Sequence, residues 1–411
     1  ILMLAYGIYF IASVFLGALL LVLSVFNSKI RLNYYTSYKQ IFYIKEVLST
    51  KNINKKTVLL FHAASSGEYE QIKPILRNLD KQKFFIIQSF TSPSIYNQDH
   101  NNQLYDLKLY HPFDLFWLSY LFFKNINPQK YIITRHDIWP GHILTAKLLN
   151  IPIYYINANV HQNSFWYKRS IRLFSKYILN KITCFIVPSE QIYNNLLNIN
   201  ISPSKIQIIR DSRFDQIIHS KNKRSQQAII PDGWNKNNTI IFGSIDRQDE
   251  KFIFDSLPII IKNKSIILVP HEIDNNTIIR ISNKLESLSC SFIKSSVLPH
   301  SMIGITVLLV DQLGLLTNLY AHANKAYIGG GFQRGVHSVL EPAIYDCSIG
   351  CGPNIEILDE AKQLYVSGNL TIINNQEDMD TFLINDSNDS NSSKVFNNSN
   401  GVSKLIEHIL L

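Results

Sequence analysis

Short runs of apolar, often β-branched residues alternate along this chain with segments of helical spacing, and this alternation is what most constrains its fold. The candidate strands lie at residues 57–63, 83–90, 131–137, 151–158, 184–189, 238–244, 265–270, 306–311 and 325–331. Helical patterns occupy residues 70–79, 115–124, 142–149, 250–261, 277–288, 313–323 and 338–345. The strands are continuously apolar, as expected when helices cover both faces of a parallel sheet. The order predicts an α/β fold of doubly wound parallel sheets.

The domain organisation follows from length and from two changes in composition. At 411 residues the chain is long enough for two domains, because one core rarely grows past about 250–300 residues. A polar, basic stretch at 219–236 predicts the linker between α/β domains at 29–218 and 237–384. An Asn/Ser-rich segment at 385–400 favours disorder, and the apolar segment 401–411 is expected to form a final helix. The carboxyl ends of the strands of both domains are expected to face a common cleft.

Residues 1–28 contain no charged side chain. A helix of this length, rising ~1.5 Å per residue, exceeds the ~30 Å hydrocarbon core of a bilayer. A buried core helix would carry a polar face, and a signal peptide would have a shorter apolar run followed by a small-residue cleavage site. The segment therefore predicts a transmembrane anchor.

The segment after the apolar run is basic. Its only acid is Glu46, and its basic residues are Lys29, Arg31, Lys39, Lys45, Lys51, Lys55 and Lys56. This bias predicts that the following domains lie on the cytoplasmic side of a membrane. Because the segment supplies most of the net charge of +9, a nucleic-acid partner is not required. No zinc-finger spacing or arginine-rich recognition stretch supports one.

Metal ligation receives little support from the sequence. The four cysteines, Cys184, Cys290, Cys347 and Cys351, fit a reduced compartment, and the last two lack a second Cys/His pair at metal-ligand spacing. The Asp378-Met379-Asp380 triplet lies in a polar stretch and is better interpreted as the start of a helix. We expect neither a metal nor another cofactor.

The stretch 329–345, GGGFQRGVHSVLEPAIY, follows a predicted strand and suits a nucleotide. Its glycines would let the backbone approach a ligand closely. A helix beginning near 336–338 would offer free N–H groups to a phosphate, and Glu341 could accept hydrogen bonds from ribose hydroxyls. The alternative is an ordinary tight turn with a surface glutamate.

Other strand ends in the second half carry similar loops. Gly243-Ser244, Pro270-His271-Glu272 and 311–314 each follow a predicted strand. Any one of them could be a simple turn. Together with 329–345, they favour a ligand site at one edge of a single sheet.

In the first half, three residues are candidates for chemistry. Glu68 follows the strand 57–63 and the small residues Ser65-Ser66-Gly67, so it is either a helix-start acid or a carboxylate presented to a substrate. Asp137, in TRHDIWPGH, could equally be a helix N-cap. Arg213, in RDSRFD, could bind a phosphate through its planar, permanently charged group, or lie exposed on the surface.

These motifs together resemble the 3-deoxy-D-manno-octulosonic acid (Kdo) transferases, which are membrane-anchored GT-B enzymes. The resemblance is collinear over about residues 1–370 and rests on FNSKIRL, HAASSGE, HPFD, DIWP, RDSRFD, GSIDRQDE, PHEI, DQLGLL, GGGFQRGVHSVLEPAIY and CGPN. It implies transfer of Kdo from CMP-Kdo to a lipid A precursor (lipid IVA) at the bacterial inner membrane. It also implies an acceptor-binding N-terminal domain, a CMP-sugar-binding C-terminal domain and an inverting, metal-independent mechanism.

The resemblance implies roles for individual residues. Glu68 matches the catalytic base, Asp137 a second acid that is usually glutamate, and Arg213 a basic group that stabilises the transition state. The implied CMP-binding set is Ser244, Pro270, His271, Gly314, Leu315, Leu316, Gly330, Gly331, His337, Ser338, Val339, Leu340 and Glu341. Two alternatives remain: a GT-B transferase with another nucleotide sugar, and an inactive, membrane-anchored CMP-binding homologue.

Overall fold

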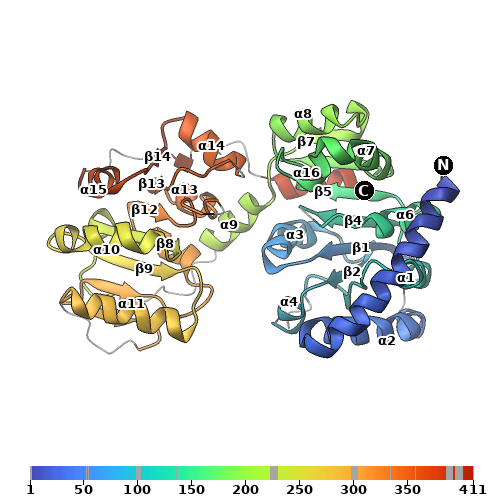
Figure 1. The fold of residues 1–411 in the computed structure, drawn as a ribbon, viewed down its shortest axis with the longest axis horizontal. Coiled ribbons are helices and arrows are strands. Elements are labelled where there is room, and N and C mark those ends of the chain that lie inside the picture. Colours follow the sequence, from blue (N-terminus) through green and yellow to red (C-terminus); the bar gives the residue numbers. More distant parts are fainter. Residues whose placement is uncertain are drawn as a thin grey trace. The chain divides into compact units, whose positions relative to one another are not determined.

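The computed structural model describes residues 2–51, 53, 55–98, 103–135, 137–222, 230–297, 304–333, 335–356, 358–385, 392–393 and 401–410. It divides into two compact units, each built around its own sheet (Figure 1). Unit 1 comprises Ile1–Gln216 and Gly401–Leu411, and unit 2 comprises Ile217–Asn400. The GT-B class predicted from the sequence, with two doubly wound α/β units, is confirmed.

The unit 1 sheet has seven strands in the order β3-β2-β1-β4-β5-β6-β7, and all of its pairings are parallel. The strands are β1 (Thr57–Ala63), β2 (Phe84–Phe90), β3 (Leu107–Tyr110), β4 (Lys130–Thr134), β5 (Ile153–Ile156), β6 (Cys184–Val187) and β7 (Ile206–Ile208). The helices that follow them are α3 (Ser66–Asn78), α4 (Pro93–Gln98), α5 (Phe116–Ile126), α6 (Pro140–Leu148), α7 (Arg172–Leu179), α8 (Glu190–Asn198) and α9 (Arg213–Asn222).

Both faces of this sheet are buried, as the continuous apolar strands predict. Leu59 and Phe61 of β1 point into one hydrophobic cluster, while Val58 and Leu60 point into a second. The first cluster includes Ile406 of the C-terminal helix α16 (Val402–Leu410), which packs on α3. The red helix in Figure 1 accordingly completes the unit built by the first half of the chain.

The N-terminal region forms two helices, α1 (Leu2–Phe26) and α2 (Ser28–Thr50), separated by the N-cap Asn27. Among the described residues, one helix is long and apolar enough to cross a membrane; its 18-residue span Tyr9–Phe26 has a mean hydropathy of 2.5 and is 17% buried. The basic segment after it forms α2, which packs on α5 and β3 through Ile41 and Ile44.

The unit 2 sheet also has seven parallel strands, in the order β10-β11-β9-β8-β12-β13-β14. The strands are β8 (Thr239–Ile245), β9 (Ser265–Pro270), β10 (Phe292–Lys294), β11 (Val307–Leu309), β12 (Lys325–Ile328), β13 (Ser348–Cys351) and β14 (Leu370–Ile372). The helices are α10 (Asp249–Ile260), α11 (Asn275–Ser287), α12 (Leu316–Leu319), α13 (Leu340–Ile344), α14 (Asp359–Val366) and α15 (Gln376–Ile384).

Several predicted elements differ from the structure in extent. The strand expected at 131–137 ends at Thr134, because Arg135 adopts φ 57° and leaves the strand conformation. The helix expected from 338 starts at Leu340 and has five residues, and the one expected at 313–323 is reduced to α12 followed by a 3₁₀ turn. Strands β3, β7, β10, β13 and β14 were not predicted, since three or four residues carry too little pattern.

The predicted linker lies partly, and the predicted low-complexity segment mainly, outside the described residues. Helix α9 runs into the predicted linker as far as Asn222, and residues 223–229 are not described. Of the segment 385–400, only 385 and 392–393 are described. The boundary between the two units falls inside α9, between Gln216 and Ile217.

Candidate active site

The topology of unit 1 brings Glu68 and Asp137 to one place. Strand β1 is the first in the chain and lies between β2 and β4, so the strand order reverses on its two sides. In doubly wound sheets, ligands bind at such a switch point, outside the carboxyl ends of the strands. Glu68 follows β1 and Asp137 follows β4, so both candidates lie at this position.

Glu68 lies in the first turn of α3, whose N-cap is Ser65. The Ser65 hydroxyl accepts from the Glu68 N–H, while Glu68 Oε2 accepts from the Ala64 N–H at 2.7 Å. The side chain is therefore turned back over the end of β1, and only 6% of the residue is exposed. Burial raises the pKa of Glu68, and the negative charge of Asp137 raises it further. These are the properties of a carboxyl group that can take up a proton.

Asp137 is bonded at both carboxylate oxygens. Oδ2 pairs with His62 Nε2, and Oδ1 accepts from Trp139 Nε1. Burial acts to raise the pKa of Asp137, but the charge and hydrogen bond of His62, together with Trp139, bring it below its usual value. Asp137 is therefore ionised at neutral pH. It is not the N-cap of α6, which is Trp139.

A chain of buried polar side chains extends from Asp137 into the unit. His62 Nδ1 lies 3.1 Å from Ser89 Oγ, which lies 3.1 Å from His111 Nδ1. His111 Nε2 lies 3.1 Å from His142 Nδ1, and the rings of His62 and His111 stack at 3.9 Å. Burial lowers the pKa of His111 and of His142, so both are neutral at physiological pH. Sequence reasoning missed this chain, although its histidines lie in HAASSGE, HPFD and DIWPGH.

Arg213, the third candidate of unit 1, is paired with a neighbouring acid. Its Nε and Nη2 lie 3.0 and 2.9 Å from Asp211 Oδ2, and its side chain is 15% exposed. Asp211 Oδ2 also accepts from Gln71 Nε2 at 3.1 Å, one turn along α3 from Glu68. Of the two alternatives for Arg213, an exposed surface position is therefore wrong: Asp211 links its side chain to the helix that carries Glu68.

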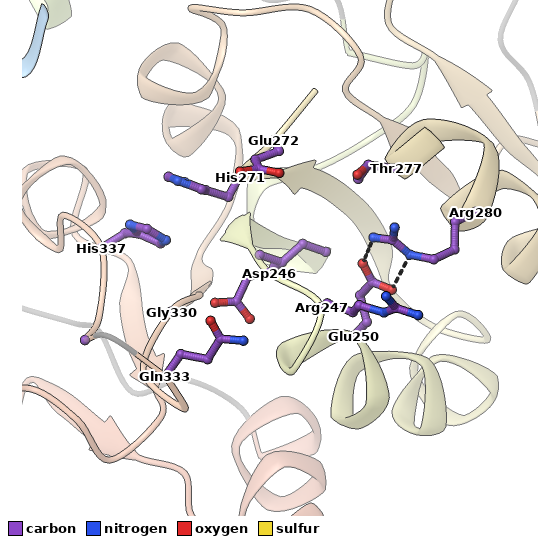
Figure 2. A pocket seen from close by; sticks show the side chains of 12 residues that line it. Asp246, Arg247, Glu250, His271, Glu272, Thr277, Arg280, Gly330, Gln333 and His337 are labelled. Carbon is purple, nitrogen blue, oxygen red and sulfur yellow. Dashed lines mark hydrogen bonds and ion pairs between the residues drawn. The ribbon is translucent and has the colours of Figure 1, made fainter. Parts of the chain in front are cut away.

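Unit 2 contains a cavity of about 440 Å³ at its own switch point, where β8 lies between β9 and β12. The lining residues come from the ends of these strands and from α10 and α11 (Figure 2): Ile245, Asp246, Arg247, Glu250, His271, Glu272, Thr277, Arg280, Gly330, Gln333, Gly335 and His337. Among the CMP-binding residues expected from the resemblance, His271, Gly330 and His337 line this cavity.

Most of the charge in the cavity lies on Asp246, Arg247, Glu250 and Arg280, which were not predicted as site residues. Arg280 forms a two-bond ion pair with Glu250, with Nε 3.1 Å from Oε2 (Figure 2). This hydrogen bond raises the pKa of Arg280. The rings of His271 and His337 stack with their centroids 4.1 Å apart. Burial, and to a smaller extent the neighbouring His271, lower the pKa of His337 to about 4. Little in the sequence indicated Arg280 as a site residue, because Arg280 lies within a helix rather than at a strand end.

The loops around the cavity are held by a buried acid, Asp249. Its Oδ2 accepts from the N–H groups of Asp246 at 2.9 Å and Gly330 at 3.0 Å, and Oδ1 accepts from the Tyr327 hydroxyl at 2.7 Å. Burial raises the pKa of Asp249 to about 6. Gly330 has φ 88°, so a side chain here would strain the loop.

The remaining expected CMP-binding residues lie at carboxyl ends of the same sheet but do not line this cavity. Ser244 is in β8 with φ 52°, Pro270 ends β9, and Gly331 packs on Gly352. The stretch 314–316 leads into α12, while Ser338, Val339 and Leu340 precede or start α13. Glu341 accepts from the Ser338 hydroxyl. The helix expected to present its N-terminus to phosphate is thus the five-residue α13, which starts at Leu340 rather than at 336–338.

In the described part of the chain, no group of three or more His, Cys, Asp and Glu side chains is arranged to hold a metal ion. Cys347, just before β13, and Cys351, the last residue of β13, are both buried.

Solved structures with this architecture include UDP-GlcNAc 2-epimerases. The enzyme from Neisseria meningitidis bound to UDP-GlcNAc has a TM-score of 0.58 at 15% identity, covering 86% of this chain and 99% of its own. The enzyme from Rickettsia bellii has a TM-score of 0.56 at 14% identity, covering 86% and 96%. At these identities the likeness concerns the fold alone. The two doubly wound units have the architecture of the GT-B fold class.

Sequence comparisons relate the chain to one family of glycosyltransferases. Residues 37–216 match the family model "3-Deoxy-D-manno-octulosonic-acid transferase (kdotransferase)". The chain is 26% identical to the 3-deoxy-D-manno-octulosonic acid transferase of Rickettsia prowazekii over 385 residues, covering 88% of this chain and 78% of that protein. It is 24% identical to the corresponding transferase of Chlamydia muridarum, covering 77% of each. Over most of its length the chain is therefore similar to Kdo transferases of lipopolysaccharide biosynthesis, and its first half carries the family model.

Proposed function

We propose that this chain transfers Kdo from CMP-Kdo to the lipid A precursor lipid IVA, with Glu68 as the general base. The observation that carries the proposal is the arrangement of Glu68 and Asp137 at the switch point of unit 1. Two neighbouring carboxyl groups have pKa values moved apart: Glu68 upward, mainly by burial, and Asp137 downward by His62. Divergent pKa values in one site are typical of groups with different catalytic roles.

In the proposed reaction, Glu68 takes a proton from the acceptor hydroxyl as that oxygen attacks the anomeric carbon of Kdo. Its raised pKa makes it a stronger base than an exposed glutamate. Asp137 stays ionised and stabilises the positive charge that develops on the sugar ring. The CMP phosphate leaves with its electron pair, and Arg213 supplies permanent positive charge to it. These steps describe an inverting, metal-independent transfer.

The unit 2 cavity is the proposed CMP site. Arg247 and Arg280 offer cationic groups for a phosphate, and the Gly330 backbone allows close approach of the ligand. His271 and His337 form a flat, stacked surface suited to a base or ribose. The expected residues outside this lining, including 314–316 and Glu341, remain proposed contacts of the same nucleotide.

Helix α1 is the proposed single-pass anchor in the bacterial inner membrane, with the two units on the cytoplasmic side. The exposed basic side chains of α2, such as Lys29, Arg31, Lys39 and Lys45, support this orientation. An anchored enzyme meets a lipid acceptor at raised effective concentration, because both are confined to one surface.

The test is incubation of the purified full chain with CMP-Kdo and lipid IVA, followed by mass measurement of the lipid product. A Kdo-bearing lipid is expected, and its mass also reports the number of sugars added. Two rivals give different results. A transferase with another nucleotide sugar would be inhibited by UDP rather than CMP. An inactive homologue would bind CMP and yield no product.

A further inference from the structure

An open, largely apolar groove of about 410 Å³ lies in unit 1 between α1, α6 and α7. Helix α1 contributes one wall through Ala12 and Leu16. Leu144 of α6 and Phe174 and Ile178 of α7 form the other, and Asp114 is the one acidic lining residue. A groove of this size and polarity suits a flexible hydrocarbon chain.

Several contacts fix the α1 wall to the unit, and three of them involve polar or small residues of α1. The Ser13 hydroxyl accepts from the Phe116 N–H at 3.1 Å, and so caps α5, whose own N-cap residue makes no side-chain bond. The Tyr9 hydroxyl donates to Asp114 Oδ1 at 2.9 Å. Gly17 faces the Trp117 ring, where a Cβ would lie at 3.2 Å. Most of the other described side chains of α1 are apolar and exposed, with Phe15 at 73%, whereas Leu20 is buried.

The outer rim of the groove combines apolar and basic side chains. Leu173 and Phe174 of α7 are 85% and 43% exposed. Lys168, Arg169 and Lys176, on or just before α7, are exposed beside them. Apolar side chains next to basic ones match a lipid whose headgroup carries negative charge.

The inner end of the groove adjoins the candidate catalytic loop. Asp114 Oδ2 accepts from the Gly141 N–H at 2.9 Å, in the first turn of α6. Pro140, which also lines the groove, is three residues from Asp137. A molecule whose apolar tail filled the groove would therefore have its polar head near Asp137.

We propose that this groove binds one acyl chain of the glycolipid acceptor. The proposal rests on the proposed function. An acyl chain is the occupant because the groove is apolar, is walled by the one described helix that suits a bilayer, and is edged by cations that match the acceptor's phosphates. The bound acyl chain would orient the acceptor sugar toward Glu68 and Asp137. Such positioning raises the reaction rate because it reduces the freedom of the reactants.

A matched pair of variants tests the groove in the full chain. Ala12→Trp places an indole in the groove, whereas Ala18→Trp adds the same side chain at an exposed position of α1 outside it. We expect Ala12→Trp to raise the KM for lipid IVA about tenfold or more, since part of the acyl burial is lost. The KM for CMP-Kdo should stay unchanged in both variants, and Ala18→Trp should match the unsubstituted protein. An unchanged acceptor KM in Ala12→Trp overturns the proposal.

Photolabelling gives a second readout that needs no turnover. Lipid IVA with a diazirine in one acyl chain should label peptides of α1 and α7, and Ala12→Trp should remove this labelling. Equal labelling by a diazirine phosphatidylethanolamine would mean a bulk-lipid groove and would overturn the acceptor assignment, as would no labelling. If the unsubstituted protein makes no product, the proposed function fails, and the labelling still decides the groove.

Discussion

His62 Nε2 and Asp137 Oδ2 form a hydrogen bond although the two residues are 75 positions apart in the chain. His62 is fully buried in β1, while Asp137 follows β4, the strand next to β1. The pair therefore sets the direction of the Asp137 carboxylate and keeps it ionised. It also bears on the proposed role of Asp137 at a position where the resemblance implies the longer glutamate: β1 supplies a partner that holds the shorter side chain.

The first prediction concerns this pair. His62→Asn removes the ring that bonds Asp137 and lowers its pKa, so we expect kcat to fall up to about 100-fold from misplacement. The pKa of Asp137 should rise, because the lowering influence of His62 is lost. The acid limb of the kcat–pH profile should therefore move to higher pH, with the KM for CMP-Kdo unchanged. A variant that folds and keeps both kcat and the acid limb would contradict the role of His62.

The second prediction concerns Glu68. Glu68→Gln should lower transfer by about 10²–10⁴-fold, the usual contribution of a general base, and leave CMP affinity unchanged. In the unsubstituted protein, activity should fall as pH decreases through the raised pKa of Glu68, above its usual 4.5. The matched control is Glu190→Gln, an exposed acid in the first turn of α8, which should leave kcat unaffected.

Thermal unfolding separates chemistry from stability in Glu68→Gln. A folded-state pKa raised by burial means that ionising Glu68 opposes folding at neutral pH. Glutamine removes the charge and keeps an oxygen to accept from the Ala64 N–H. The Tm at pH 7 should therefore equal or exceed that of the unsubstituted protein. A marked drop in Tm would show that the activity loss reflects misfolding.

The third prediction concerns the donor cavity. Arg280→Ala removes a cation from the cavity and leaves Glu250 without its two-bond partner, so CMP affinity should fall about tenfold or more. Titration of CMP into the protein measures the change. Adding Glu250→Gln should restore part of the affinity, because it removes the uncompensated negative charge. Lys284→Ala, one turn further along α11 and exposed, is the control and should bind CMP normally.

The fourth prediction concerns the docking of α1. A Cβ on Gly141 would collide with the Tyr9 ring and with Asp114 Oδ1. Gly141→Ala should therefore destabilise unit 1 by about 1–3 kcal/mol, as overpacking does. Tyr9→Ala in the same chain should recover part of the loss, because it removes the ring that the new methyl group meets. Unfolding of the single and double variants measures the coupling, and full additivity would mean that the two residues do not meet.

The local sequence pattern alone determined the fold class of this protein and the position of several candidate site residues. The alternation of apolar runs with helical spacing specified two doubly wound parallel sheets, because a strand buried on both faces leaves a continuous apolar signature. Glu68, Asp137 and the glycine-rich loop at 329–345 could be located as strand-end residues, since that position depends only on where a strand stops. Short strands such as β13 were not predicted, because four residues carry little periodicity.

The tertiary structure decided which of these residues meet. Strand order places β4 beside β1, and that order alone brings His62 to Asp137 and joins His111 to His142. It also brings Arg280 of a helix into the cavity of unit 2, and α16 from the end of the chain onto α3. Local periodicity reports the environment of each segment but not its neighbours, and a hydrogen bond between distant residues exists only once the strand order is set.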